Sequence, residues 1–325
     1  MAFTDEQLEE WIEGLTAQVE SRLLETLRTP HNFVEEAARY LVDAGGKMFR
    51  PALVMAAGGL GLEEGTVNED ALVSAAVAVE LTHVASLYHD DVMDEAELRR
   101  GAPSAHRKWS NSVAIMIGDY MLAEASVLGA SLGVDFVRYQ GHTISRLVQG
   151  QIAEMVGPSQ GVDPITHHLE VIKGKTAALI NAAARYGGWF GGLEPDQVEQ
   201  LTQYGENLGM AFQLADDLLD IVSDESGKSP GTDLREGVPT LTTLLIQTHR
   251  RSEDERLLSL LSGPVSDSDL SETLALVRAH PAVEEARDEV RKWAEKARAC
   301  LSGFEESAST RLLNVVCDQA VMRSS

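Results

Sequence analysis

An unusually apolar stretch, Ala71–Tyr88, restricts what this chain can fold into more than any other feature of the sequence. Its length is about that of a membrane span. However, Glu80 and His83 lie inside the stretch, and the pair Asp90–Asp91 follows it directly. Because burying such groups in lipid is costly, we interpret the stretch as the central helix of a helical protein.

The composition favours an all-α fold. Aromatic residues make up 5% of the chain, there are 10 prolines, and apolar residues rarely alternate with polar ones as in strands. The breaks marked by Gly and Pro are too short and too apolar for a domain linker. We therefore expect one domain, 1–325, with helices at about 5–28, 32–44, 51–60, 69–97, 111–131, 135–156, 165–187, 195–223, 239–262, 268–279, 282–301 and 304–322.

The net charge of -24 limits the classes of partner. Such an acidic surface repels nucleic acid and anionic lipid, so a negatively charged substrate would need metal ions or a local basic patch. Cys300 and Cys317 are too few for a disulfide framework or a zinc site. The acidic N-terminal stretch lacks the basic and apolar regions of a signal peptide, and we expect a cytoplasmic protein.

One acidic motif occurs twice, as DDVMD at 90–94 and as DDLLD at 216–220. In a helix, residues four apart share a face, where like charges repel. One such cluster can be a solvated helix end, but the repetition indicates that two helices hold Mg²⁺, which takes a few carboxylates together with substrate phosphates and water. The candidate metal ligands are Asp90, Asp91, Asp94, Asp216, Asp217 and Asp220.

Cations accompany the Gly turns and the two Asp motifs. In GGKMFRP, Lys47 and Arg50 lie at a helix start that Pro51 can open, which is a natural anion site. Each cation alone is a weak signal because surface cations are common, but together they suit a diphosphate. The other candidates are Arg99, Arg100, Lys173, Lys175 with Thr176, and Lys228.

Together these motifs resemble those of the trans (E-type) polyprenyl diphosphate synthases. The matches are GGKMFRP, ELTHVASLYHDDVMDEAELRRG, GDYMLA, KTAAL and FQLADDLLD, and the resemblance covers most of the chain. It implies a single all-α domain of antiparallel helices around a central cavity, normally a homodimer.

The resemblance also implies the reaction. Isopentenyl diphosphate condenses head to tail with an allylic partner (geranyl, farnesyl or geranylgeranyl diphosphate), with about three Mg²⁺ ions per site. Peripheral membrane contact for product release is compatible with this activity.

Carried over motif by motif, the resemblance gives each candidate a role. Asp90, Asp94 and Asp216 bind Mg²⁺, supported by Asp91, Asp217 and Asp220. The diphosphate of isopentenyl diphosphate is held by Lys47, Arg50, His83 and Arg100. The allylic diphosphate is held by Arg99, Lys175 and Lys228. Thr176 and Gln213 place oxygens near the developing cation and, with Lys175, form the catalytic group.

Two departures from the family pattern lie after the second Asp motif. Val238 stands where the family commonly has a lysine, and Thr240–Thr242 reads TLT in place of TLP. The first change leaves fewer cations beside the second motif, although Lys228 remains.

Small residues precede the first Asp motif on the face along which the allylic tail should run. They are Ala85, Ser86, Thr82 and Val79. In the family a bulky ring just before the motif stops growth early, so these residues favour a medium- to long-chain product of roughly thirty to fifty carbons, as in quinone tails. Alternatively, another helix supplies the floor of the tunnel through Met121 or Leu122.

Three other functions compete with this reading: a short-chain (geranylgeranyl or farnesyl) diphosphate synthase, a subunit of a heteromeric synthase, and a class I terpene cyclase. A cyclase usually lacks a second DDxxD motif and needs no isopentenyl site, so DDLLD and GGKMFRP argue against it. A non-catalytic subunit could lose its Asp motifs, whereas both are intact here.

Overall fold

The computed structural model describes residues 3–222 and 230–323, and helices dominate these ranges, so the all-α prediction is confirmed. The strands β1 (Leu98–Arg99) and β2 (Ala102–Pro103) form one short antiparallel hairpin. The helices are α1 (Asp5–Thr26), α2 (Asn32–Asp43), α3 (Phe49–Gly58), η1 (Gly59–Gly61), α4 (Glu69–Met93), α5 (Ala105–Lys108), α6 (Asn111–Leu132), α7 (Val134–Val156), α8 (Pro164–Ile172), η2 (Lys173–Ala177), α9 (Ala178–Phe190), α10 (Pro195–Val222), α11 (Thr232–Glu236), α12 (Leu241–His249), η3 (Ser252–Asp254), α13 (Glu255–Leu260), α14 (Asp267–Arg278), α15 (Ala282–Cys300) and α16 (Ala308–Arg323).

Contacts divide the chain into two compact units, each assembled from separate segments. Unit 1 comprises Met1–Ser145, Leu179–Thr202 and Gly303–Leu313. Unit 2 comprises Arg146–Ala178, Gln203–Ser302 and Asn314–Ser325. The helices α7, α9, α10 and α16 contribute residues to both units, and the single-domain organisation stays a prediction.

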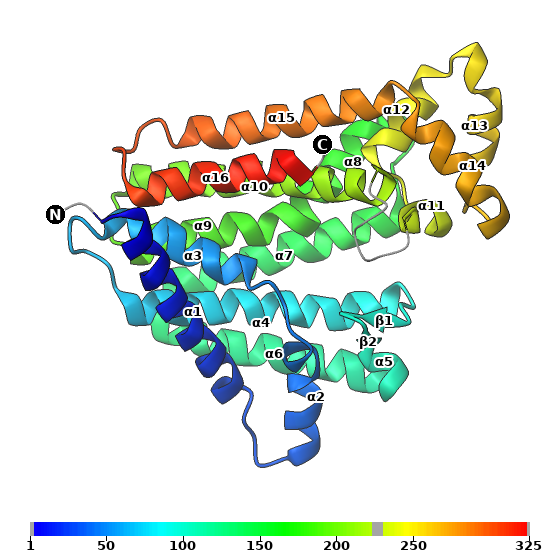
Figure 1. Cartoon of the computed structure of the whole chain (residues 1–325). Coiled ribbons are helices and arrows are strands. Elements are labelled where there is room, and N and C mark those ends of the chain that lie inside the picture. The colour runs from blue at the N-terminus through cyan, green and yellow to red at the C-terminus, as the bar shows by residue number, and fades with distance from the viewer. Residues whose placement is uncertain (1–2, 223–229, 324–325) are drawn as a thin grey trace. The chain divides into compact units, whose positions relative to one another are not determined.

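The core helix of unit 1 is α4, which contains the apolar stretch Ala71–Tyr88. Asn68 caps its start by accepting a hydrogen bond from the Ala71 N–H. The helix is apolar on nearly every side, as expected of a helix buried all round, and α1, α3, α5 and α6 pack against it (Figure 1).

By length and composition alone, α4 and α6 could each cross a membrane, a test that core helices of soluble proteins also pass. The most apolar window of α4 is 83% buried within the protein, and that of α6 is 33% buried. The burial of α4 agrees with the prediction of a core helix.

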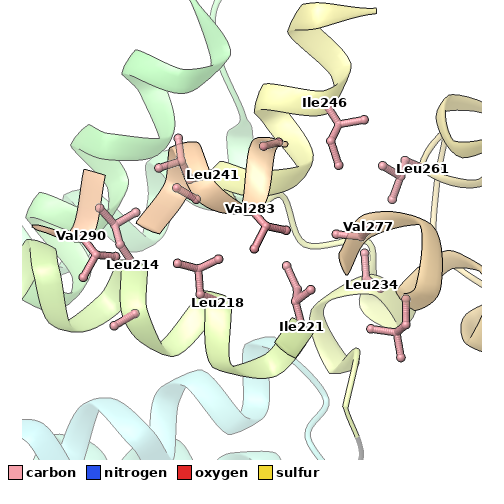
Figure 2. Close-up of a cluster of buried hydrophobic side chains, with 14 of the residues drawn as sticks. Leu214, Leu218, Ile221, Leu234, Leu241, Ile246, Leu261, Val277, Val283 and Val290 are labelled. Atoms are coloured by element: carbon pink, nitrogen blue, oxygen red, sulfur yellow. The ribbon is translucent and has the colours of Figure 1, made fainter. Parts of the chain in front are cut away.

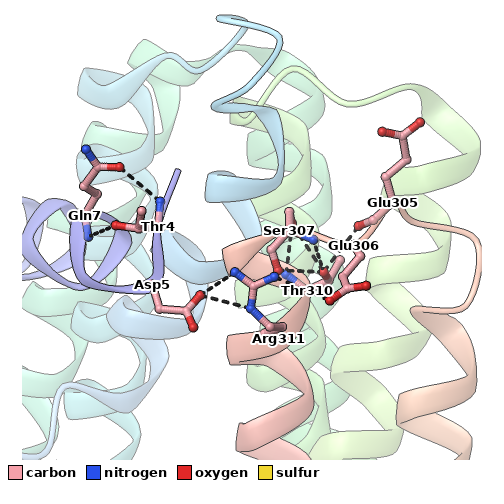
Figure 3. A network of polar contacts seen from close by, with 8 residues as sticks. All are labelled: Thr4, Asp5, Gln7, Glu305, Glu306, Ser307, Thr310 and Arg311. Atoms are coloured by element: carbon pink, nitrogen blue, oxygen red, sulfur yellow. Dashed lines mark hydrogen bonds and ion pairs between the residues drawn. The ribbon is translucent and has the colours of Figure 1, made fainter. Parts of the chain in front are cut away.

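A polar cluster in unit 1 joins segments from the two ends of the chain (Figure 3). Thr4 and Gln7 form a capping box at the start of α1. Arg311 of α16 donates two hydrogen bonds, of 3.0 and 2.6 Å, to the Asp5 carboxylate. The start of α16 is thereby fixed to the start of α1.

The core of unit 2 is a cluster of aliphatic side chains from α10, α12, α14 and α15 (Figure 2). Leu214, Leu218 and Ile221 recur along one side of α10 at helical spacing and are at most 2% exposed. The same helix bears the second Asp motif, so its buried side anchors the residues that carry the motif.

Three expected helices were wrong in their extent. The helix expected at 69–97 ends at Met93, because the chain turns into the β1–β2 hairpin. The helix expected at 165–187 is interrupted by η2, a π-helical turn. The helix expected at 239–262 breaks at Arg250, which takes a left-handed conformation (φ 45°) that ends α12.

Candidate functional site

The first Asp motif occupies the last turn of α4 in unit 1. Asp90 is partly buried, whereas Asp94 is exposed and forms the C-cap, with its N–H 2.8 Å from the Asp90 carbonyl oxygen. The helix end therefore presents these two carboxylates one turn apart, as the spacing in the sequence predicts.

The middle aspartate of this motif has a different environment. Asp91 is 0% exposed, and its Oδ1 accepts a hydrogen bond from Nε of Arg99 at 2.7 Å, with Nη2 at 2.6 Å. The Asp91 Oδ2 is buried without a hydrogen-bond partner. The structure thus pairs Arg99, a predicted allylic diphosphate ligand, with a motif carboxylate.

A group of charges surrounds the part of α4 that precedes the motif: Glu80 and His83 come from α4 and Arg50 from α3, with Glu80 buried and the other two partly buried. Burial lowers the pKa of Arg50 and raises that of Glu80, each partly offset by the other's charge. Burial also lowers the pKa of His83 well below its usual value, and the charges of Arg50 and Arg100 lower it further. His83 is therefore neutral at physiological pH, beside two cations and one carboxylate.

The Gly pair before Lys47 allows close approach to one of these cations. A Cβ on Gly46 would lie 2.9 Å from Nη2 of Arg100, and the Arg100 guanidinium donates to the Leu41 carbonyl oxygen at 2.5 Å. Met48 precedes α3 in a left-handed conformation (φ 46°), and Lys47 is exposed. Unit 1 thus brings Lys47, Arg50, His83 and Arg100 into one region around the start of α3 and the middle of α4.

A second polar group lies within unit 2, where the predicted catalytic residues meet. The Thr176 hydroxyl donates to Oε1 of Gln213 at 2.8 Å, and Nε2 of Gln213 donates to Oδ1 of Asp217 at 2.7 Å. Lys175 pairs with the Glu154 carboxylate. Thr176 comes from η2, while Gln213 and Asp217 are one turn apart on α10.

Sequence reasoning missed two residues of this group, His168 and Asp233. His168 Nε2 lies 3.7 Å from Oδ2 of Asp217. Burial, together with the nearby charges of Asp217 and Asp220, raises the pKa of Asp233 to about 7. The signal for Asp233 was its place in GTDLREG, because α11 follows the second motif closely in sequence.

The last aspartate of the second motif holds the chain that follows. Oδ1 of Asp220 accepts the Thr232 N–H at 3.2 Å, and Oδ2 accepts the Asp233 N–H at 3.1 Å. Both carboxylate oxygens of Asp220 therefore bind backbone at the start of α11. Val238, which replaces the family lysine, is 37% exposed, and Lys228 lies outside the described residues.

The donors at both motifs suit a hard divalent cation. All six aspartates offer carboxylate oxygen, the ligand type that Mg²⁺ prefers, and the buried Oδ2 of Asp91 lacks a partner. Within residues 3–222 and 230–323, no group of three His, Cys, Asp or Glu side chains is assembled to hold a metal ion by itself. Mg²⁺ commonly completes its coordination with substrate phosphates and water. The carboxylates therefore fit an ion whose remaining ligands come from a bound diphosphate and from water.

The predicted tail-binding residues divide between two environments. Val79 and Thr82 line a cavity in unit 1 with about 10 Å³ of free space, roughly the room of one water. Ala85 is fully buried, and the Ser86 hydroxyl donates to the His83 carbonyl oxygen at 2.8 Å. The other cavity-lining residues are Ala78, Phe136, Gln140, Thr143, Leu179, Ala182 and Tyr186, so neither Met121 nor Leu122 is among them.

Comparisons with known proteins agree with this architecture. The family model described as polyprenyl synthetase matches residues 31–277. A nonaprenyl diphosphate synthase of Mycobacterium tuberculosis is 43% identical, over 94% of this chain and 92% of its own.

Two solved structures are similar over nearly the whole chain. One is a geranylgeranyl pyrophosphate synthase from Corynebacterium glutamicum complexed with calcium and isoprenyl diphosphate (TM-score 0.89, 37% identity, 100% of each chain). The other is a decaprenyl diphosphate synthase from Rhodobacter capsulatus (TM-score 0.88, 31% identity, 99% of this chain and 100% of that one). The chain therefore belongs to the polyprenyl synthetase family and is a trans-prenyltransferase with the all-α isoprenoid synthase fold.

Proposed function

We propose that this enzyme condenses isopentenyl diphosphate with an allylic diphosphate and releases a medium- to long-chain all-trans polyprenyl diphosphate. The observation that carries the proposal is the polar chain from Thr176 through Gln213 to Asp217, with distances of 2.8 and 2.7 Å. It links a hydroxyl proposed to face the developing cation to a carboxylate of the second Asp motif, so the group that would stabilise the cation is held by a group that would support the metal site.

Mg²⁺ is the proposed metal, with Asp90, Asp94 and Asp216 as ligands and Asp217 in support. When bound, it would neutralise charge that grows on the leaving diphosphate. Asp91 and Asp220 act through neighbours instead, because Asp91 orients Arg99 and Asp220 holds the start of α11.

Two different sets of cationic side chains hold the two diphosphates. Lys47, Arg50 and Arg100 hold the diphosphate of isopentenyl diphosphate, and neutral His83 adds a hydrogen bond. Arg99, Lys175 and Lys228 hold the allylic diphosphate, with Lys175 oriented by Glu154. Preorganised cations of this kind stabilise charge that develops on a leaving group more than water does.

The carbocation is protected by oxygens and by apolar walls. Thr176 and Gln213 present side-chain oxygens to it, and buried residues of α4 exclude the water that would quench it. The double bond of isopentenyl diphosphate then attacks, and the proton lost from the product leaves with diphosphate, so no side-chain base is needed.

Product length follows from the small residues Ala85 and Ser86 and from the cavity beyond them. The stacked rings of Phe136 and Tyr186, with centroids 4.3 Å apart, line that cavity beside Val79. We place the floor of the tail tunnel at this ring pair. The small size of the cavity means that a tail reaching it must displace side chains.

A homodimer is the proposed assembly, with α6 at its interface. Apolar side chains stand exposed along α6 and the start of α7: Ile115, Met116, Val127, Val134 and Val137 are 39–74% exposed. An apolar stripe of this kind is typical of a protein interface. The proposed location is the cytoplasm, in keeping with the free thiols of Cys300 and Cys317.

Release of diphosphate by the purified protein tests the reaction class. With Mg²⁺, farnesyl diphosphate and isopentenyl diphosphate, we expect release that stops when EDTA is added. Asp216→Asn should lower the rate at least about a hundredfold, because a lost metal ligand removes transition-state stabilisation.

The same assay separates the competing functions. Release from farnesyl diphosphate alone would indicate a terpene cyclase. No release under any condition would indicate a non-catalytic subunit of a heteromeric synthase.

A further inference from the structure

The catalytic residues Lys175 and Thr176 lie on an irregular piece of backbone. They belong to η2, a π-helical turn over Lys173–Ala177 between α8 and α9. A π-turn widens the helix by one residue and is frequently found at functional sites, but it needs support from its neighbours. The question is what keeps this turn in place.

One face of α7 contacts three successive residues of the turn. Arg146, Gly150 and Glu154 are four residues apart, so they lie one above another on α7. Nη2 of Arg146 donates to the Lys173 carbonyl oxygen at 3.4 Å, and Glu154 pairs with Nζ of Lys175. All of these residues belong to unit 2.

The middle contact is made by backbone alone. A Cβ on Gly150 would lie 2.5 Å from the Lys175 backbone nitrogen and 2.8 Å from the Gly174 carbonyl carbon. Conversely, a Cβ on Gly174 would lie 2.9 Å from the Gly150 Cα. Helix α7 and the turn η2 therefore touch at a pair of glycines, where a side chain on either one would push the backbone of the turn away.

Glu206 of α10 strengthens the contact between Arg146 and Lys173. Its Oε2 is 2.8 Å from Nη2 of Arg146, and its Oε1 is 3.3 Å from Nζ of Lys173. Lys173 thus pairs with Glu206, which it shares with Arg146, while Lys175 pairs with Glu154. The two lysines of KGKTA are thereby assigned to different partners.

We propose that Arg146, Gly150 and Glu154 are positioning residues, and that this face of α7 fixes the π-turn so that Lys175 and Thr176 meet the allylic diphosphate. Gly150 is the central member. Glycine inside a helix normally destabilises it relative to alanine, so a glycine at this place has a packing function that offsets that cost. The roles of Lys175 and Thr176 rest on the proposed function, but the support of the turn by α7 does not.

Gly150→Ala in the full chain is the direct test. The added methyl should displace the turn, so hydrogen exchange of the segment 173–177, followed by mass spectrometry, should become faster. The KM for farnesyl diphosphate should rise, or kcat fall, on the order of tenfold to a hundredfold, because a small misplacement of catalytic groups has such an effect. The KM for isopentenyl diphosphate should stay within about twofold, because its proposed ligands lie in unit 1.

Gly14→Ala is the matched control. Gly14 is also inside a helix, α1, but a Cβ there would meet nothing within 4 Å. This variant should match the wild type in exchange and in both KM values. If Gly150→Ala folds and also matches the wild type in both measurements, the proposal is overturned.

A second variant keeps the test decisive if Gly150→Ala does not fold. Glu154→Gln adds no volume and removes only the charge that orients Lys175, so it should raise the KM for farnesyl diphosphate without lowering the melting temperature. Unchanged kinetics in Glu154→Gln would then overturn the proposal. A wild type that makes no product contradicts the proposed function instead, and the exchange comparison still decides whether α7 supports the turn.

Discussion

Asp91 and Asp220 of the two Asp motifs accept hydrogen bonds from groups that follow their own motif in the chain, within their own unit. Asp91 pairs with Arg99, and Asp220 accepts two backbone N–H groups. The spacing in the sequence placed the aspartates on common helix faces, but it did not indicate these partners. Between Asp91 and Arg99 the chain turns at Glu95, which has a φ of 51°, a local conformation that helical periodicity does not indicate.

Ala85→Phe should shorten the product. Ala85 is fully buried on α4, and a ring there would narrow the path of the growing tail. Chromatography of the dephosphorylated products measures the effect, with Ala17→Phe on the exposed side of α1 as the control. A product ladder identical to that of the wild type would contradict the assignment of the tunnel.

Phe136→Ala should have the opposite effect and lengthen the product. Phe136 stacks on Tyr186 at the cavity that Val79 and Thr82 line, so its removal opens the proposed floor. The same chromatography detects longer chains. If the longest product is unchanged in a folded Phe136→Ala protein, the floor lies elsewhere, for example at Met121 or Leu122.

His83 should make stability depend on pH in the slightly acidic range. Its pKa in the folded protein lies well below the usual value, because of burial and the nearby arginines. In the unfolded chain the pKa returns to about 6.5, so below that pH only the unfolded state takes up this proton, and the free energy of unfolding falls as the pH falls. The full contribution of neutral His83 to the free energy of unfolding is present above about pH 6.5.

Urea unfolding between about pH 7 and pH 5 measures this effect. In His83→Gln the free energy of unfolding should decline less over this range than in the wild type. Equal slopes for the two proteins would show that His83 does not carry a lowered pKa.

At the scale of elements, most helices follow from periodicity, whereas their interruptions do not. The ends of α6, α14 and α15 lie within one residue of expectation, since their apolar residues recur at helical spacing between clear breaks. The π-turn η2 was not predictable, because its support comes from Gly150 and Glu154 on α7. Tertiary contacts of this kind leave no trace in local periodicity.

Helix α6 also shows what periodicity leaves undecided. It is apolar on more than one side, yet only one side is buried on α4, and Met116 and Val127 remain 60% and 69% exposed. We predict that Val127→Glu converts a dimer into monomers, because an unpaired charge is costly in an apolar interface. Sedimentation measures the change, with Val315→Glu, at an exposed valine of α16, as the control. A dimer that survives Val127→Glu with unchanged affinity would place the interface elsewhere.

At the scale of the whole molecule, the duplicated Asp motif predicted a metal site, and together with the other sequence motifs it predicted the family. The two copies lie in different units, on α4 and α10, and each unit gathers its own polar group from several segments. The sequence therefore sufficed for the all-α class, the family and the reaction type. It did not reveal the division into two units, and it did not show that Asp233 belongs to the polar group of unit 2. Both depend on contacts between segments that are apart in the chain.

Mass spectrometry of the products that the purified protein forms from farnesyl diphosphate, isopentenyl diphosphate and Mg²⁺ tests both the proposed activity and the proposed product length. We predict a series of all-trans polyprenyl diphosphates, each longer by one isopentenyl unit, that ends at roughly thirty carbons or more, because small residues line the proposed tail path. A series that stops after a single addition would contradict the predicted product length, and the absence of any isopentenyl incorporation would contradict the proposed function itself.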